Sequence, residues 1–275
     1  MITGVVSDHP LISIVTIVRN GLPFVRETIA SVLSQDYPRL EYWIIDGGST
    51  DGTVDAIKQS QQKLAGWVSE PDRGISDAFN KGLARTRGDY VMFLNADDAL
   101  ASSRAVTMLV DAAGNAGWPD VIYGDCNLID RSSGAVLYRT SIDYDAERFL
   151  NFGMLPHPSM LVHRRYFDRF GPFDLSFRSA MDYELLLRGV PELGATRAPV
   201  LITNVRTGGE STRDPIRVIE ENIRALDKNG YGRSRMWVFR VRAQAHVRFL
   251  LRRLLEGMNL YQFARRRMGK PPIAT

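Results

Sequence analysis

A run of apolar residues that ends in an amide and two carboxylates constrains this chain more than any other feature. Residues 90–94 are all apolar, and Asn95, Asp97 and Asp98 follow. Five consecutive apolar residues are typical of a strand buried on both faces, and open parallel sheets bind ligands where such strands end. Adjacent carboxylates there would repel each other unless a hard divalent cation lay between them. The stretch predicts a metal site or, alternatively, an acidic cap on a helix that begins near Ser102.

Composition limits the class of protein. The chain has 275 residues, of which 44% are hydrophobic and 24% charged, as expected for one large domain or one domain with an appendage. Its single cysteine, Cys126, excludes an internal disulfide and a cysteine-rich metal site. No cationic start precedes a long apolar core, and the apolar run at residues 11–18 is too short to span a bilayer. We therefore expect neither an export signal nor a transmembrane helix.

Charge divides the chain into an acidic body and a basic tail. Residues 231–275 carry eleven Lys or Arg and a single acid, Glu256. Their net charge of +10 leaves −6 for residues 1–230, since the whole chain has +4. The pI near 9.3 therefore describes the tail. We predict a domain at 1–230 and a basic helical appendage at 231–275.

Apolar runs and turn signals alternate in a βαβ order, which predicts right-handed crossovers and parallel strands. Strands are predicted at residues 11–18, 40–45, 65–69, 90–94, 120–123, 135–139 and 159–162. Helices are predicted at residues 23–34, from 53 onward, and at 75–85, 103–113 and 180–188. The predicted fold class is α/β, with a mainly parallel central sheet flanked by helices.

Polar residues recur where the first strands end. Asn20 follows the first predicted strand, Asp46 the second, and Asp72 with Arg73 the third. The carboxyl ends of parallel strands share one edge of a sheet, so we expect these residues to meet there. A core needs no acids at this edge, and burying them without partners would be unfavourable. The convergence favours a metal site over a simple helix cap.

Four segments in this order closely resemble the family 2 glycosyltransferases. They are residues 14–20, 44–53, 70–82 and 93–98, and the resemblance covers roughly residues 10–215. It implies a Rossmann-like GT-A fold, a nucleotide-sugar donor that is usually a UDP-sugar, a divalent metal (Mn²⁺ or Mg²⁺) and inversion at the anomeric carbon. The subgroup it resembles builds bacterial surface polysaccharides and glycolipids. The Q-x-x-R-W motif and membrane helices of processive members are absent, which implies transfer of single sugars.

The resemblance also implies roles for the donor-side residues. Asn95-Ala96-Asp97 stands at the D-x-D position of the family, with Asn95 in place of the first acid. Asp97 is then the candidate metal ligand at the donor diphosphate, and Asp98 a ribose or indirect partner. Asp46 matches an acid that contacts the nucleotide base, although Gly47 stands where a second acid is frequent. The predicted donor-binding residues are Asn20, Asp46, Asp72, Arg73, Asn95, Asp97 and Asp98.

An inverting transfer needs a base beside the attacking hydroxyl and a cation on the leaving diphosphate. Asp182 aligns with the base of the family, although the preceding position, often acidic, holds Met181. Glu184 is the alternative base. Asp182 could instead cap its helix, because Asp is favoured at helix starts.

Three further residues are acceptor-side or loop candidates. His157 beside Pro158 is either a hydrogen-bonded structural residue or a contact to acceptor or diphosphate. Gly208 and Gly209 resemble a loop that closes over the donor, with a plain surface turn as the alternative.

The basic tail has an amphipathic character. Residues 236–255 interleave aromatic and aliphatic residues with five arginines, too many for a membrane-spanning helix. A basic helix of this kind suits an anionic membrane surface, which predicts a cytoplasmic protein held peripherally at the inner face of the cell membrane. Packing on the domain and homodimerisation are the alternatives. No recognised motif accompanies the charge, so no nucleic-acid partner is expected.

We therefore predict a hexosyltransferase-class enzyme that moves one sugar from a nucleotide-sugar to a glycan or lipid-linked acceptor. A nucleotidyltransferase is one alternative, which would attack the α-phosphate and release pyrophosphate. A non-catalytic sugar-nucleotide-binding or scaffold protein is another, suggested by Asn95 and Met181. The sequence does not identify the sugar, the acceptor, the linkage or the oligomeric state.

Overall fold

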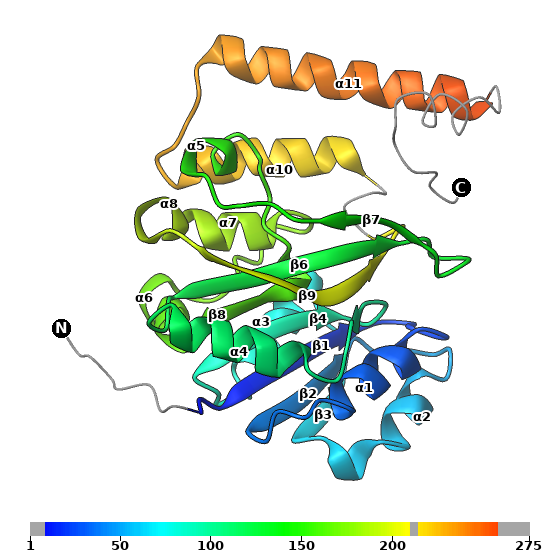
Figure 1. The fold of residues 1–275 in the computed structure, drawn as a ribbon. Coiled ribbons are helices and arrows are strands. Elements are labelled where there is room, and N and C mark those ends of the chain that lie inside the picture. The colour runs from blue at the N-terminus through cyan, green and yellow to red at the C-terminus, as the bar shows by residue number, and fades with distance from the viewer. Residues whose placement is uncertain (1–8, 210–213, 258–275) are drawn as a thin grey trace.

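The computed structural model describes residues 9–209 and 214–257 (Figure 1). One sheet runs through these residues in the order β3-β2-β1-β4-β8-β6-β9-β5, with β7 paired to β6. Its strands are β1 Ile12–Val18, β2 Leu40–Asp46, β3 Gly66–Ser69, β4 Tyr90–Asn95, β5 Ala99–Leu100, β6 Val121–Ile129, β7 Val136–Thr140, β8 Met160–His163 and β9 Thr196–Arg206.

The half of the sheet made by β1, β2, β3 and β4 is parallel, as predicted. β1 pairs with both β2 and β4, and β2 pairs with β3. The register sets Val18 beside Asp46 and Ile17 beside Asn95, so these three strands end at one level. The loops that carry the predicted donor residues therefore leave the sheet at the same edge.

The other half is mixed. β8 runs antiparallel to β4 and β6, whereas β9 runs parallel to β6 and antiparallel to β5. Sequence patterns do not predict β9, because it contains Pro199 and lacks a continuous apolar run. β6 extends to Ile129, beyond the predicted 120–123, since its register shifts after Tyr123 and polar residues interrupt the apolar pattern.

Helices cover both faces of the sheet and bury two apolar clusters. Within β1, Ile12 and Ile14 belong to the cluster with α1 and α4, and Val15 belongs to the cluster with α3 and α7. This alternation is the period-two pattern of a strand between two helical layers. The helices are α1 Val25–Leu33, α2 Thr53–Lys58, α3 Ile75–Leu83, α4 Ala105–Asn115, α5 Ala146–Phe149, α6 Arg164–Phe170, α7 Met181–Leu187, α8 Val190–Leu193, α10 Pro215–Lys228 and α11 Arg235–Gly257, with short 3₁₀ turns η1 Gln61–Lys63 and η2 His157–Ser159.

The C-terminal helices are stacked outside this layer. α10 contacts both α7 and α11, and Figure 1 shows α11 (orange) lying beyond α10 from the sheet. Trp237 near the start of α11 packs on Phe152, with ring centroids 5.4 Å apart. Among the described residues, none of the helices combines the length and apolar composition needed to cross a bilayer. The predicted domain boundary at residue 230 falls between α10 and α11 and stays a prediction.

Candidate active site

Asp46 anchors the loop that follows β2. Its side chain is fully buried. Oδ2 accepts the N–H groups of Gly48 (3.2 Å) and Ser49 (3.0 Å) and the hydroxyl of Ser69 (2.6 Å), while Oδ1 accepts the Ser49 hydroxyl. These bonds compensate for burial of the carboxylate. Asp46 therefore shapes the donor-side loop, and its contact with a nucleotide base stays a prediction.

Asn20 ties the loop after β1 to the same structure. Its φ of 52° lies in the left-handed region, which Asn tolerates better than most residues. Its Oδ1 accepts the N–H of Thr50 (2.9 Å), and its own N–H donates to Ser49 Oγ (2.7 Å). The loops after β1 and β2 are thereby joined, as expected for residues that line one site.

Asp72 lies directly against Gly47. A Cβ at position 47 would lie 2.2 Å from Asp72 Oδ2, so a side chain there would collide with this carboxylate. Asp72 Oδ1 accepts the N–H of Gly74 (2.9 Å) at the start of α3. The neighbouring Arg73 is 75% exposed and bonds to Asp77 at 2.8 Å, which holds the pKa of Asp77 below its ordinary value. A side chain at position 47 would therefore require the Asp72 carboxylate to move.

Asp98 closes the turn after β4. Asn95 Nδ2 donates to Asp98 Oδ2 (3.0 Å), and the N–H of Arg206 donates to Asp98 Oδ1 (3.1 Å). Only 2% of Asp98 is exposed, and this burial, with the nearby charge of Asp97, raises its pKa to about 7. α4 has no side-chain cap, so neither acid of this pair is a helix cap. The alternative of a simple cap near Ser102 is wrong.

The side chain of Asp97, in contrast, is partly exposed to solvent. Its side chain is 29% exposed, and Oδ2 lies 2.5 Å from Arg131 Nη1 in the loop between β6 and β7. Arg206 at the end of β9 donates from Nη1 to the carbonyl of Asp97 (2.6 Å). The guanidinium carbons of both arginines lie 4.5 Å from the centre of the Phe24 ring. Two cations that sequence reasoning missed thus surround Asp97.

The side chains around Asp97 limit how a divalent ion could be held. The described residues contain no group of three or more His, Cys, Asp or Glu side chains that could hold one. In proteins that bind nucleotides, Mg²⁺ is usually held by one or two carboxylates. Phosphate oxygens and water complete its coordination shell. A single accessible carboxylate such as Asp97 fits that arrangement, whereas Asn95 is already bonded to Asp98.

Asp182 is the second residue of α7 and is half-buried. Its Oδ1 accepts the N–H of Tyr183 at 2.8 Å. The amides that precede α7 are bonded instead by Glu221 of α10, which accepts from the three consecutive N–H groups of residues 178–180 at 3.0, 2.8 and 2.9 Å. The N-cap residue of α7 is Ala180, so Asp182 does not occupy the cap position, and Glu221 fixes the backbone that leads into the helix.

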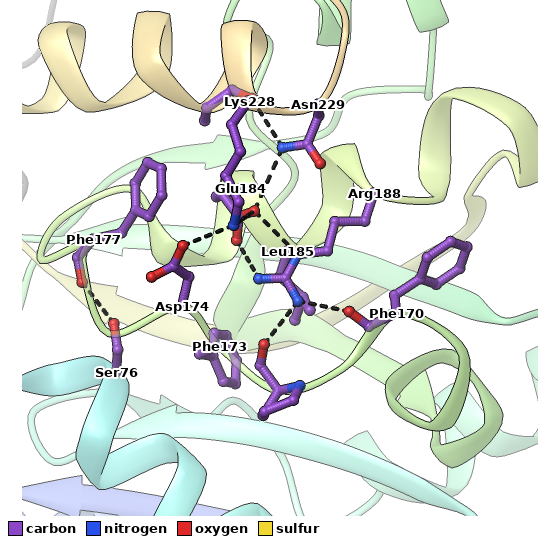
Figure 2. A network of polar contacts seen from close by, with 12 residues as sticks. Ser76, Phe170, Phe173, Asp174, Phe177, Glu184, Leu185, Arg188, Lys228 and Asn229 are labelled. Carbon is purple, nitrogen blue, oxygen red and sulfur yellow. Dashed lines mark hydrogen bonds and ion pairs between the residues drawn. The ribbon is translucent and has the colours of Figure 1, made fainter.

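Glu184 lies inside a closed network of ion pairs (Figure 2). Its carboxylate is fully buried and bonds Arg188 Nε (3.1 Å) and Lys228 Nζ (2.7 Å), and the same Nζ bonds Asp174 (2.7 Å). Burial alone would raise the pKa of Glu184, but the bonds from Arg188 and Lys228 outweigh it and lower the pKa. The network joins α7 to α10, so the geometry favours Asp182 over Glu184 as the base.

His157 packs in an aromatic cluster between β4 and α3. Its ring is stacked on Phe93 at 5.9 Å and meets Phe79 edge-on at 5.6 Å. Burial lowers the pKa of His157, and the negative charge of Asp182 opposes this shift. The packing supports the structural interpretation of His157 within an aromatic cluster.

Hydrogen bonds from side chains of α3 to distant backbone groups join the donor side of the site to the segment that precedes Asp182. The hydroxyl of Ser76 on α3 donates to the carbonyl of Phe177 (2.7 Å), drawn at the left of Figure 2. The side chain of Asn80, also on α3, bonds both backbone groups of Phe173 at 2.8 and 2.9 Å. Because α3 begins at Ile75, three residues after Asp72, these bonds hold the donor loop and the segment before Asp182 in one frame.

The predicted closing loop starts beside Arg131. Gly208 has a φ of 89°, a conformation that favours glycine, and a Cβ there would lie 3.6 Å from Arg131 Cδ. Gly209 follows it, and residues 210 and 211 of the predicted loop lie outside the described residues. The role of Gly208 and Gly209 in covering a donor stays a prediction.

Residues 13–171 match the model of Glycosyl transferase family 2. An uncharacterised glycosyltransferase of Mycobacterium tuberculosis is 33% identical over 184 residues, which cover 66% of this chain and 70% of the relative. A PGL/p-HBAD biosynthesis glycosyltransferase of Mycobacterium bovis is 28% identical over 182 residues, or 65% and 69% of the two chains.

Solved structures share the fold at low sequence identity. S. aureus TarS 1–349 in complex with UDP-GlcNAc superposes with a TM-score of 0.63 at 15% identity, covering 86% of this chain and 71% of that one. The mannosyltransferase PcManGT of Pyrobaculum calidifontis, in complex with GDP-Man and Mn²⁺, gives 0.59 at 19% identity, covering 86% and 69%. Glucosyl-3-phosphoglycerate synthase of M. tuberculosis, with Mn²⁺ and UDP, gives 0.58 at 18% identity, covering 82% of each chain.

Proposed function

Because the chain belongs to glycosyl transferase family 2, as its match over residues 13–171 shows, we propose that it transfers one sugar, with inversion, from a nucleotide-sugar. The predicted glycosyltransferase class is confirmed by this membership, and the predicted GT-A fold by the solved structures. The proposal concerns the chemistry beyond that class: the donor, the base, the metal and the acceptor.

One observation carries the proposal. The bond from Ser76 to Phe177 links the donor-side helix α3 to the segment that leads into Asp182. Phe79 of α3 packs on Phe93 of β4, the strand that leads to Asp97, with ring centroids 4.8 Å apart. The partly exposed carboxylates Asp97 and Asp182 are therefore held in one frame, while Asp46, Asp98 and Glu184 are buried in hydrogen bonds or ion pairs. A site with a cation at one carboxylate and a second carboxylate that is free to accept a proton suits an in-line displacement.

In this mechanism the acceptor hydroxyl attacks the anomeric carbon and the bond from that carbon to the diphosphate oxygen breaks. Asp182 accepts the hydroxyl proton, a role worth about 10²- to 10⁴-fold in rate for a positioned base. Asp97 would hold a divalent ion, Mn²⁺ or Mg²⁺, and the ion would supply positive charge to the departing diphosphate. Asn20, Asp72 and Arg73 line the nucleotide side.

The proposed donor is a UDP-sugar. The fold neighbours include proteins crystallised with UDP-GlcNAc and with UDP and Mn²⁺, and another holds GDP-Man with Mn²⁺. They support a nucleoside diphosphate with a divalent ion and leave GDP as the competing nucleotide. The deep hydrogen bonding of Asp46 supports a rigid base-side loop in either case.

The proposed acceptor is a glycan or a lipid-linked molecule at an anionic membrane surface, which would make the protein peripheral at the inner face of the membrane. α11 supports this docking because large apolar side chains are exposed at a helical spacing over its length. They are Met236 (72%), Phe239 (69%), Val247 (55%), Leu250 (64%), Leu251 (51%) and Leu254 (59%). Arginines lie between them along the helix and can pair with anionic lipid headgroups.

A thermal-shift screen against nucleotide-sugars, with and without Mn²⁺, tests the proposed function. A ligand that binds only the folded state must raise the melting temperature. We expect a Mn²⁺-dependent shift with one UDP-sugar and weaker shifts with GDP- and dTDP-sugars, followed by transfer and release of UDP in the presence of acceptor. Release of pyrophosphate would instead indicate a nucleotidyltransferase. Donor binding without turnover on any acceptor would favour the sugar-nucleotide-binding alternative.

A further inference from the structure

The carboxylate proposed to hold the metal is already paired with a cation of the chain. Arg131 Nη1 lies 2.5 Å from Asp97 Oδ2, and the two side chains are 38% and 29% exposed. The backbone N–H of Arg131 donates to Thr207 Oγ1 (3.1 Å), and its guanidinium lies over Phe24. Arg131 is thus held at Asp97 by the loop that carries it and by the ring beneath it.

We propose that Arg131 and the divalent ion compete for the carboxylate of Asp97, and that the guanidinium, once displaced, binds the diphosphate of the donor. This inference rests on the proposed function, since it assigns a further residue to the same site. Two cations at one carboxylate oxygen would repel each other, so the ion and Arg131 exclude each other. A guanidinium matches phosphate oxygens with paired N–H donors, which makes the diphosphate a suitable second partner.

The position of Arg131 allows such an exchange. It lies in the turn between β6 and β7, outside the sheet pairing, and a partly exposed ion pair is weak enough to be replaced. Arg206, the other cation here, is only 8% exposed and bonds both the Asp97 carbonyl and Glu27. Arg206 therefore holds the turn in place, and Arg131 is the cation that can move.

Mn²⁺ binding to the full chain without nucleotide tests the competition. The free ion is followed by electron paramagnetic resonance. Arg131→Gln should bind Mn²⁺ about five- to tenfold more tightly than the native protein, because a competing positive charge is removed. Arg131→Lys, which keeps the charge, should stay near the native affinity. Asp97→Asn in the Arg131→Gln background should remove the gain.

The matched control is Arg139→Gln. Arg139 lies on β7 of the same hairpin and pairs with Asp125, which retains Arg197 as a second partner. This variant removes the same charge from the same hairpin and should leave Mn²⁺ affinity unchanged. Equal Mn²⁺ affinities in the native protein, Arg131→Gln and Arg139→Gln would overturn the competition.

Inorganic pyrophosphate, in the presence of saturating Mn²⁺ that displaces the guanidinium from Asp97, tests the diphosphate contact. Arg131→Gln should bind it about fivefold more weakly than the native protein, and Arg139→Gln equally well. An unchanged pyrophosphate affinity in Arg131→Gln would refute this contact. Neither measurement uses a sugar donor or an acceptor, so its failure is distinct from a failure of the donor screen.

Discussion

Asp97 and Asp182 are both partly exposed carboxylates, but their neighbours differ. Asp97 faces the guanidinium of Arg131 and has Arg206 behind it. Asp182 lies near the neutral ring of His157 and bonds one backbone N–H. A carboxylate among cations suits a diphosphate and its metal, whereas one beside an uncharged ring suits proton transfer.

Asp182→Asn should lower the rate of sugar transfer by about 10²- to 10⁴-fold and leave donor affinity nearly unchanged, because an amide cannot accept the hydroxyl proton. Asp97→Asn should instead weaken Mn²⁺-dependent donor binding. Initial rates with saturating acceptor and calorimetric titration of the donor measure the two effects. Equal losses of donor affinity in both variants would contradict this division of roles.

His157 should make stability depend on pH. Burial lowers its pKa from the ordinary 6.5, so below that pH the unfolded chain binds a proton that the folded chain does not. The contribution of His157 to the free energy of unfolding is complete above its unfolded pKa and is lost as the pH falls toward the folded pKa. His157→Phe keeps an aromatic ring but cannot bind a proton, so its free energy of unfolding should not show this decrease at low pH.

Melting temperatures of the native protein and His157→Phe, recorded from about pH 7.5 to about pH 5, check this effect. The native protein should lose stability relative to the variant as the solution becomes acidic. Parallel curves over this range would show that His157 titrates normally.

At the scale of elements, α10 positions α7. One carboxylate of α10, Glu221, accepts the N–H groups that precede Asp182, and Lys228 of α10 pairs with the buried Glu184 of α7. α7 has only seven residues and no side-chain cap at its own N-cap. A helix this short depends on tertiary contacts for its position, so the direction of Asp182 depends on α10.

Glu221→Gln should therefore lower kcat about tenfold, with donor KM unchanged, because small displacements of a base are costly. It should also reduce the free energy of unfolding by about 1–2 kcal/mol, since bonds to a charged acceptor become bonds to a neutral one. Steady-state kinetics and urea unfolding measure these effects.

Glu220→Gln is the matched control on the same helix. Glu220 pairs with Arg242 of α11 at 2.6 Å and is partly exposed. Its loss should leave kcat unchanged, because it bonds α11 and not the segment before Asp182. A normal kcat in Glu221→Gln, at a temperature where the protein is fully folded, would limit Glu221 to a structural role.

At the scale of the whole molecule, the proposed docking surface and the candidate site lie on different layers. α10 lies between α7 and α11, and the ion pairs of Lys228 with Glu184 and of Glu220 with Arg242 connect the three helices. The exposed apolar side chains of α11 are thus tied, through α10, to the helix that carries Asp182.

The paired change Leu250→Glu and Leu254→Glu should weaken binding to vesicles that contain anionic phosphatidylglycerol by at least about tenfold. Each leucine contributes roughly 1.5–3 kcal/mol when buried, and the new charges are repelled by the lipid. Sedimentation with vesicles measures binding. Both leucines are exposed, so folding should be unaffected.

Val136→Glu is the control for this surface, because it places a single glutamate at an exposed apolar residue of β7, away from α11. It should leave vesicle binding unchanged. Unaltered vesicle binding in the leucine variant would refute membrane docking. Loss of a dimer in light scattering would favour the alternative of self-association.

Much of the donor side is predictable from the sequence because its signals are local. Apolar runs predict β1, β2 and β4, and the polar residues after them, Asp46 and Asp97 among them, follow within a few positions. Parallel pairing then brings these ends together without further information. The family resemblance adds roles to residues such as Asp182 that no local pattern distinguishes from a helix cap.

Arg131, Arg206 and Glu221 could not be predicted, because each acts on a residue distant in the sequence. Arg206 reaches Asp97 only because β9 pairs with β6 and β5, and Glu221 reaches the start of α7 only because α10 packs on it. The sequence by itself determined which strand ends carry acids, since hydrophobic period and turn chemistry act over a few residues. Only the tertiary structure decided which cations and carboxylates surround those acids, because such contacts depend on the packing of elements far apart along the chain.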